Sequence, residues 1–420
     1  MITGELLTRV LDAAGVEAIY GAPIFGLDVL QMDPLVAKTV ARAHERVHGR
    51  LAASHSGVGT LHVNPGAGMA THRVVVEDPG DIASLLDVPM RGGVEIELRT
   101  DLRNPTDVRV GEATGPDRWT DPSEQVVDQI RKAPRITVVC GPGVVRDDAV
   151  AGLHQLAASG GLGVLNTWGA KGVFDWRSIH HFATVGLQRD DFDLGGLPQC
   201  DLVIATGIDP LESPVELWGA VPHVTVETSA LSRLAESWPH ARATPTMPVL
   251  RERLAAVTQS GWTRHMAPLG PTRVTLTYSR TIGSGIVAAD PGVAGYWVAR
   301  TFATKVLRSA VVPSERDSRG SAVAACLVAR LRRRHIRCLA VTDAPLSEES
   351  ELLLEEALRM GISIPVEVWG PEGDALSASE HEERLNLAVT GDLNGAWTLA
   401  TDGNQMGQMI EAAGPVVAWT

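Results

Sequence analysis

The sequence is poor in aromatic residues and cysteine, and it has no long apolar run. Aromatic side chains make up 4% of the 420 residues, although ten of them are tryptophan. The four cysteines are far apart, without Cys-x-x-Cys spacing or a histidine pair, so neither a zinc site nor a disulfide framework is indicated. We expect buried thiols in a reducing compartment. No apolar stretch reaches the length that spans a bilayer, so no membrane partner is expected.

Basic residues are fewer than acidic residues, 37 against 50. The formal net charge is −13, which argues against nucleic acid or an acidic membrane surface as the main partner. The opening MITGELLTRVLDAAGV is typical of an amphipathic helix rather than a signal peptide, so we expect a cytoplasmic protein. A chain of 420 residues with 44% hydrophobic and 21% charged residues predicts two or three globular domains.

Short apolar runs that end in glycine or an acidic residue alternate with helical patterns along the chain. This alternation predicts the α/β class, with three consecutive doubly wound, mainly parallel-sheet domains. Proline-containing stretches without periodicity mark the linkers. The predicted division is a first domain at 1–105, a linker at 106–127, a central domain at 128–240, a linker at 241–272 and a last domain at 273–420.

Two aspartates follow predicted strands of the last domain. Asp290 ends the run in GIVAADPG, and Asp343 ends the run before VTDAPLSEES turns into a helix. Ligands of open α/β sheets bind at the carboxyl ends of strands. Glycines on both sides of Asp343 would indicate a magnesium-diphosphate site, but Thr342 and Ala344 stand there.

The central domain has glycine turns after two predicted strands. CGPGVV contains Gly141 and Gly143, and ATGIDP contains Gly207. Such turns bind nucleotides or serve as tight packing turns, and neither has Gly-x-Gly-x-x-Gly spacing or a P-loop lysine. Lys171 in GAKGVF either approaches a phosphate or is a solvated loop residue. We interpret the adjacent His180 and His181 as polar loop residues.

The string HERVH places His44 and His48 four residues apart around Glu45. It is similar to the His-Glu-x-x-His zinc motif, but Glu45 lies at a predicted strand-to-helix junction. A glutamate at a helix start is also favoured by the helix dipole. We therefore predict no metal site here.

The order of segments resembles the thiamine-diphosphate-dependent enzymes, in their acetolactate-synthase-like branch. TGELLTRVLDAAGVEAIYGAP resembles the family's first helix and strand, and VARAHERVHGRLAA the segment that carries its activating glutamate. GAKGVFDWRSIHHFATVGLQ with CDLVIATGIDP resembles the central domain. The resemblance implies a catalytic role for Glu45. It also implies cofactor-site positions for Asn64 and Gly66 in NPGAG, and for Asp290 and Asp343.

The chain departs from this family at the metal. Family members hold Mg²⁺ with a Gly-Asp-Gly turn and an asparagine after the next strand, where this chain has Trp369 and Gly370. After Gly68 only three residues precede HRVVV, so the first domain is shortened. Without the metal, a carboxylate about 4 Å from a diphosphate costs on the order of 4 kcal/mol at an effective dielectric of about 20. That cost is roughly three powers of ten in affinity.

Three functions remain open at this point. The first is a homologue that has lost its cofactor and acts as a non-catalytic or repurposed scaffold or partner subunit. The second is a working lyase or synthase for 2-oxo acids that uses thiamine diphosphate and Mg²⁺. The third is a nucleotide- or acyl-CoA-binding protein that uses the central domain. The resemblance implies a homodimer or larger even-numbered oligomer. It also suggests a hetero-oligomer in which Glu45 completes the site of an intact homologue.

Overall fold

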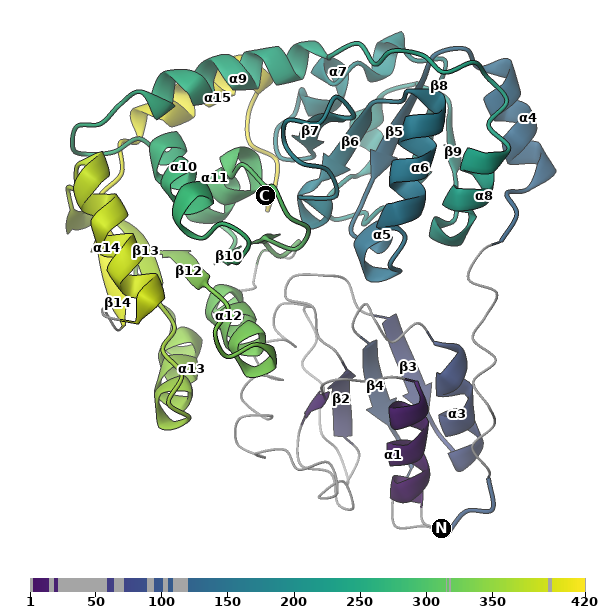
Figure 1. Ribbon diagram of the computed structural model, residues 1–420, viewed down its shortest axis with the longest axis horizontal. Helices are drawn as coiled ribbons and strands as arrows, with labels where there is room; N and C mark the ends of the chain where they lie inside the picture. Colours follow the sequence, from purple (N-terminus) through teal and green to yellow (C-terminus); the bar gives the residue numbers. More distant parts are fainter. Residues whose placement is uncertain are drawn as a thin grey trace.

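The computed structural model describes residues 3–14, 19–21, 59–63, 72–88, 94–100, 105–108, 120–314, 316, 319–391 and 395–419. Their strands form three sheets in succession, and every pairing in the two larger sheets is parallel. The predicted α/β class with three successive sheet domains is confirmed, and the two larger sheets are parallel as predicted (Figure 1). Within the described part of the chain, no helix combines the length and apolarity needed to cross a bilayer.

The first sheet is mixed rather than parallel. Its order is β1-β2-β4-β3, with antiparallel β1–β2 and β2–β4 pairs and a parallel β3–β4 pair. The first helix buries Leu6, Leu7, Val10 and Leu11, because these positions recur on one helical face. The elements are α1 (Thr3–Ala13), β1 (Ile19–Gly21), β2 (Gly59–Val63), β3 (His72–Val76), α3 (Pro79–Ser84) and β4 (Val94–Leu98).

The central sheet has the order β7-β6-β5-β8-β9, so the chain reverses direction across the sheet between β5 and β8. Both strands are continuous apolar runs, as expected for parallel strands covered on two faces. Helix α6 ends at Gly161, whose φ of 62° a residue with a side chain rarely adopts. The elements are α4 (Glu124–Lys132), β5 (Ile136–Cys140), α5 (Gly143–Arg146), α6 (Val150–Gly160), β6 (Val164–Thr167), β7 (His181–Val185), α7 (Asp191–Leu194), β8 (Leu202–Thr206), β9 (His223–Thr225) and α8 (Leu231–Glu236).

The last sheet has the order β11-β10-β12-β13-β14 and reverses between β10 and β12. Helix α14 begins with a capping box in which Ser377 and Glu380 satisfy each other's backbone N–H groups. The elements are α10 (Pro271–Thr281), β10 (Ile286–Ala289), α11 (Val293–Thr301), β11 (Ala310–Val311), α12 (Ser321–Arg332), β12 (Cys338–Asp343), α13 (Glu348–Arg359), β13 (Val366–Asp374), α14 (Ala378–Thr390), β14 (Ala396–Leu399) and α15 (Asn404–Ala413).

A long helix, α9 (Val249–Trp262), lies within the segment 241–272 that we interpreted as a linker. It packs against α15 and α10 and runs along the top of the molecule in Figure 1. Pro248 is its N-cap residue, so a proline that suggested a break marks a helix start instead.

The final GPVVAW is not a strand but a tail with a single bridge from Val416 to Gln188.

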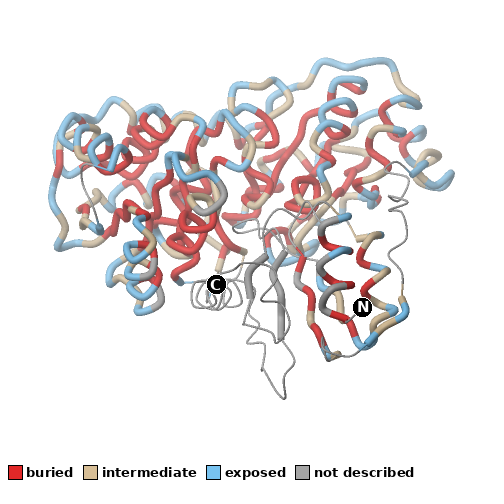
Figure 2. The backbone as a smooth tube through the Cα atoms, turned by 60° about the horizontal axis from the view of Figure 1, so that its bottom comes forward, coloured by how far each residue is buried: buried red, intermediate tan, exposed pale blue. Residues whose placement is uncertain are grey.

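The central and last domains share a buried polar interface. Arg300 of α11 forms an ion pair with Asp191 of α7, and both side chains are at most 1% exposed. Gln188 donates to the Met409 carbonyl at 2.8 Å and accepts from the Tyr296 hydroxyl at 2.8 Å. Figure 2 shows buried residues in the interior of these two domains and exposed residues at their periphery. These buried contacts join the central domain to the last domain.

Candidate functional site

The carboxyl ends of β10 and β12 form the first candidate site. These strands flank the point at which the last sheet reverses, the usual ligand position of doubly wound sheets. Asp290 follows β10 and Asp343 is the last residue of β12, so the structure brings the two predicted aspartates together. Burial is the main cause that raises the pKa of Asp343, and the charge of Asp290 adds a smaller contribution.

Asp290 is buried and caps helix α12. One carboxylate oxygen accepts from the N–H of Ala322 at 2.8 Å and the hydroxyl of Ser321 at 3.0 Å. The other accepts from the N–H of Gly320 at 3.0 Å and the hydroxyl of Thr342 at 2.9 Å. Burial raises the pKa of Asp290, although these four donors oppose the shift. The Asp290 carboxylate therefore satisfies backbone N–H groups at the start of α12.

Asp343 caps the other neighbouring helix, α11. Its two oxygens accept from the N–H groups of Val293 at 2.7 Å and Ala294 at 3.0 Å. Gly292 makes this approach possible, because a Cβ there would clash with Asp343 Oδ2 and its φ of 137° is restricted for other residues. Burial raises the pKa of Asp343, and the two backbone donors lower it. Each strand thus supplies the cap of a helix joined to the other strand.

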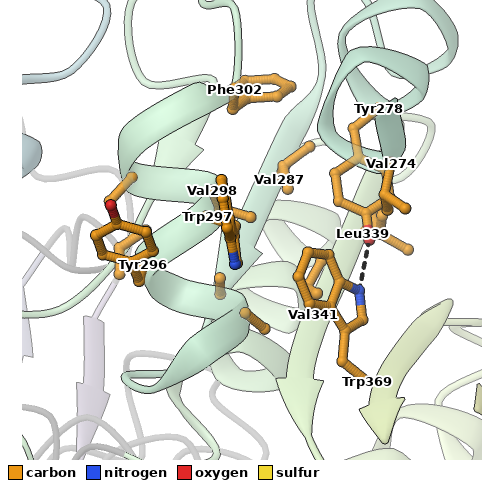
Figure 3. Packing of buried hydrophobic residues seen from close by; sticks show 14 of the residues in the cluster. Val274, Tyr278, Val287, Tyr296, Trp297, Val298, Phe302, Leu339, Val341 and Trp369 are labelled. Atoms are coloured by element: carbon orange, nitrogen blue, oxygen red, sulfur yellow. Dashed lines mark hydrogen bonds between the residues drawn. The ribbon is translucent and has the colours of Figure 1, made fainter. Parts of the chain in front are cut away.

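Trp369 lies where the resemblance would place an asparagine ligand. Its indole is 4% exposed and points into the core beside Tyr278 and Val341 (Figure 3). Its Nε1 donates to Tyr278 Oη at 3.1 Å and to Glu367 Oε1 at 3.0 Å. Glu367 also accepts from Tyr278, His381 and Trp397. Trp369 therefore stabilises a buried carboxylate and offers no oxygen ligand.

These residues do not fit Mg²⁺ with a diphosphate. Magnesium takes oxygen ligands in near-octahedral geometry, usually one or two carboxylates with phosphate and water. Here Asp343 accepts two backbone bonds, and the N–H of Ala344 donates to the Trp369 carbonyl at 2.9 Å. A helix N-terminus is also an anion site, and those of α11 and α12 already bind the chain's own carboxylates. Within the described residues, no His, Cys, Asp and Glu side chains gather as a metal ion would require.

The carboxyl ends of β5 and β8 form the second candidate site. The three predicted glycines meet here, and the N–H of Gly143 donates to the Gly207 carbonyl at 2.8 Å. A Cβ at Gly141 or Gly143 would clash with the backbone of Gly207, and one at Gly207 with the N–H of Val144. The glycines thus allow two turns to pack backbone against backbone. This geometry favours the packing interpretation over an open phosphate cradle.

Glu212 lies beside these turns, and sequence reasoning missed it. Its side chain is 1% exposed; Oε2 accepts from the Thr167 hydroxyl and from the N–H of Gly169 at 3.0 Å. Oε1 has no hydrogen-bond partner among the described residues. Burial, with a smaller contribution from Asp209, raises the pKa of Glu212 to about 8. Glu212 therefore holds a proton at neutral pH at the reversal point of the central sheet.

Lys171 is neither solvated nor poised in an open site. It is 6% exposed, and its Nζ donates to the Thr184 hydroxyl at 3.3 Å. Burial, with a smaller contribution from the charge of Arg300, lowers its pKa to about 7. His181, interpreted as a loop residue, begins β7 and is half-buried, and burial together with the charge of Lys171 lowers its pKa to about 3. Basic groups therefore lie where the central and last domains meet.

The remaining predicted residues belong to the first domain. Glu45, Asn64 and Gly66 lie outside the described residues, as do His44 and His48. Their predicted roles stay predictions.

The decisive comparison concerns the segment from α4 to β9. Residues 123–224 match the family model for the central domain of thiamine pyrophosphate enzymes. The match covers about a quarter of the chain, and it supports kinship with thiamine-diphosphate-dependent enzymes. No curated protein sequence matches the chain.

The matched segment contains the second candidate site, including Gly141, Gly143, Lys171, Gly207 and Glu212. The match does not extend to β10 and β12, so the interpretation of Asp290 and Asp343 depends on their geometry.

Proposed function

We propose that this chain is a thiamine-diphosphate-enzyme homologue of the acetolactate-synthase-like branch that has lost cofactor binding and acts as a non-catalytic partner subunit. One observation carries the proposal: the Asp343 carboxylate accepts the backbone N–H groups of Val293 and Ala294. The side chain that would ligate the metal serves as a helix cap instead.

The energetics support this interpretation. To ligate Mg²⁺, Asp343 would have to release the start of α11, and loss of such a cap costs about 0.5–2 kcal/mol. A diphosphate would also have to displace or approach two carboxylates at adjacent strand ends. Each unscreened pair of like charges at about 4 Å adds on the order of 4 kcal/mol at an effective dielectric of about 20. Tight binding would require compensating contacts that the Thr342 and Trp369 side chains do not supply.

Calorimetric titration tests the proposal. The purified chain is titrated with thiamine diphosphate in MgCl₂, and a parallel titration contains EDTA in place of Mg²⁺. We expect no saturable heat at micromolar ligand in either titration. Saturable, Mg²⁺-dependent binding in the micromolar range would instead support the alternative, a working 2-oxo acid lyase or synthase.

The partner role has its own test. We infer a homodimer or a hetero-oligomer with an intact homologue, in which Glu45 of this chain completes the partner's site. Light scattering after gel filtration measures the assembly, and a monomer at working concentration would remove the oligomer inference. If a thiamine-dependent partner co-purifies, Glu45→Gln should lower its turnover. Unchanged turnover would mean that Glu45 has only a structural role at the start of its predicted helix.

A further inference from the structure

Two of the four cysteines lie against each other in the last domain. Cys326 is on α12 and Cys338 is the first residue of β12, and α12 packs directly on this strand. Both thiols are free and fully buried in one apolar cluster. They form a hydrogen bond in which the Cys326 S–H donates to the Cys338 sulfur.

A guanidinium lies beside this pair. Arg330 is one helical turn after Cys326 on α12, so both side chains can face β12. Its Nε donates to Cys338 Sγ at 3.4 Å, and its Nη1 donates to the Arg334 carbonyl at 2.9 Å. Arg330 is only half-buried, so this edge of the pair lies near solvent.

The two sulfurs therefore differ in acidity. The hydrogen bond from Cys326 lowers the pKa of Cys338 to about 7, with burial opposing and Arg330 adding to the shift. Burial raises the pKa of Cys326 well above its usual value. The thiolate is the reactive form of cysteine, so Cys338 is the nucleophile of the pair.

We propose that Cys326 and Cys338 form a reversible dithiol–disulfide couple that peroxides oxidise. The Cys338 thiolate attacks one peroxide oxygen and the O–O bond breaks, which gives a sulfenic acid and, after protonation, water. The Cys326 sulfur then attacks the sulfenic sulfur, the S–O bond breaks, and a second water leaves with the Cys326 proton. Two thiols are oxidised to one disulfide, and one hydrogen peroxide is reduced to two waters.

The disulfide would join two elements that meet at the first candidate site. Helix α12 receives its cap from Asp290, and β12 ends at Asp343, which caps α11. A bond between Cys326 and Cys338 joins the middle of α12 to the first residue of β12, at the strand end opposite Asp343. The couple is therefore a modification site that does not depend on whether thiamine diphosphate binds.

The other two cysteines provide internal controls. Cys140 is fully buried, and burial raises its pKa. Cys200 is partly buried, donates to the Thr137 hydroxyl at 3.0 Å, and also has its pKa raised by burial. Neither sulfur has the combination of a cysteine neighbour and a guanidinium that distinguishes Cys338.

Alkylation mass spectrometry tests the couple in the folded, full-length chain. The protein is treated with hydrogen peroxide, quenched, unfolded in N-ethylmaleimide and weighed, with and without later dithiothreitol. We expect two of the four thiols to resist alkylation until dithiothreitol is added. Trypsin should then release a linked pair of peptides, 320–330 and 338–359, from the oxidised protein.

Variants define the outcome. Cys326→Ser should abolish the linked peptides and leave three alkylated thiols or a sulfenic acid on Cys338, whereas Cys140→Ser should retain the linkage. Arg330→Ala should slow its formation by roughly five-fold at pH 7, the effect of raising a thiol pKa from about 7 to about 8. Four alkylated thiols after treatment, or linkage only in urea-unfolded protein, would overturn the proposal.

Discussion

The buried Glu212 gives the sharpest test of the electrostatics. Its carboxyl group accepts from Thr167 and Gly169 through one oxygen, while the other has no partner among the described residues. Glu212→Gln keeps an acceptor for both donors and removes the titration. The variant therefore changes how stability depends on pH, apart from any constant offset that the new amide introduces.

The sign and size of this pH dependence follow from the pKa of Glu212. Folding raises it from 4.5 to about 8, so the folded protein holds the proton more tightly than the unfolded chain. The contribution of Glu212 is fully present below pH 4.5 and is lost as the pH rises to 8. The loss is about 1.4 kcal/mol per pH unit inside this window, or about 2.5 kcal/mol between pH 5 and pH 7.

Urea denaturation at pH 5, 6 and 7 measures this loss as a free energy of unfolding. The difference in free energy of unfolding between wild type and Glu212→Gln should change steadily from pH 5 to pH 7. The wild type should lose stability relative to the variant as the pH rises. Glu380→Gln is the control. Hydrogen bonds from Ser377 lower the pKa of Glu380, so the contribution of its ionisation to stability changes only below pH 4.5.

Parallel curves for wild type and Glu212→Gln between pH 5 and 7 would refute this account. Glu212 would then be ionised in the folded protein, and its unpartnered oxygen would have a donor that the described residues do not include. A pH slope of the same sign in Glu380→Gln would show that the change arises elsewhere.

Two further predictions concern the carboxylates of Asp343 and Asp191. Asp343→Ala should lower the free energy of unfolding by about 0.5–2 kcal/mol, as expected for a lost helix cap, and Asp343→Asn by less; stabilisation by either substitution would show that relief of repulsion from Asp290 outweighs the cap. Arg300→Met should destabilise by about 3–5 kcal/mol, because it leaves the Asp191 carboxylate buried without its cation. Adding Asp191→Asn should recover part of that loss in urea denaturation, and additive losses would contradict coupling between the two side chains.

Much of the sheet architecture could be predicted from the sequence. Strands β5, β8, β10 and β12 are apolar runs that end at glycine or aspartate, and such runs are buried on both faces. The edge strand β14 escaped prediction because it is short and only partly buried. Helix α9 was missed because the prolines before it resemble those of a linker.

The candidate sites were less accessible to sequence reasoning. The positions of Asp290 and Asp343 at adjacent strand ends follow from the local pattern, but their partners do not. Asp343 accepts from residues about fifty positions earlier, and only the sheet order brings them together. Glu212 follows β8 in an irregular loop, and no periodicity distinguishes a buried loop glutamate from a solvated one.

An aspartate at the end of a parallel strand has two uses that look alike in sequence. It can ligate a metal in the crevice, or it can accept from the first N–H groups of a neighbouring helix. Both uses need an unbranched, ionised side chain at the same register, so the aspartate alone does not decide between them. The groups around the aspartate distinguish the two uses, because a ligand site needs backbone N–H groups that remain free for phosphate. At Asp343 the next N–H, that of Ala344, pairs with β13, and the N–H groups of α11 bind the carboxylate itself. A helix cap that completes its own hydrogen bonds gives the last domain a reason to keep Asp343 without any cofactor.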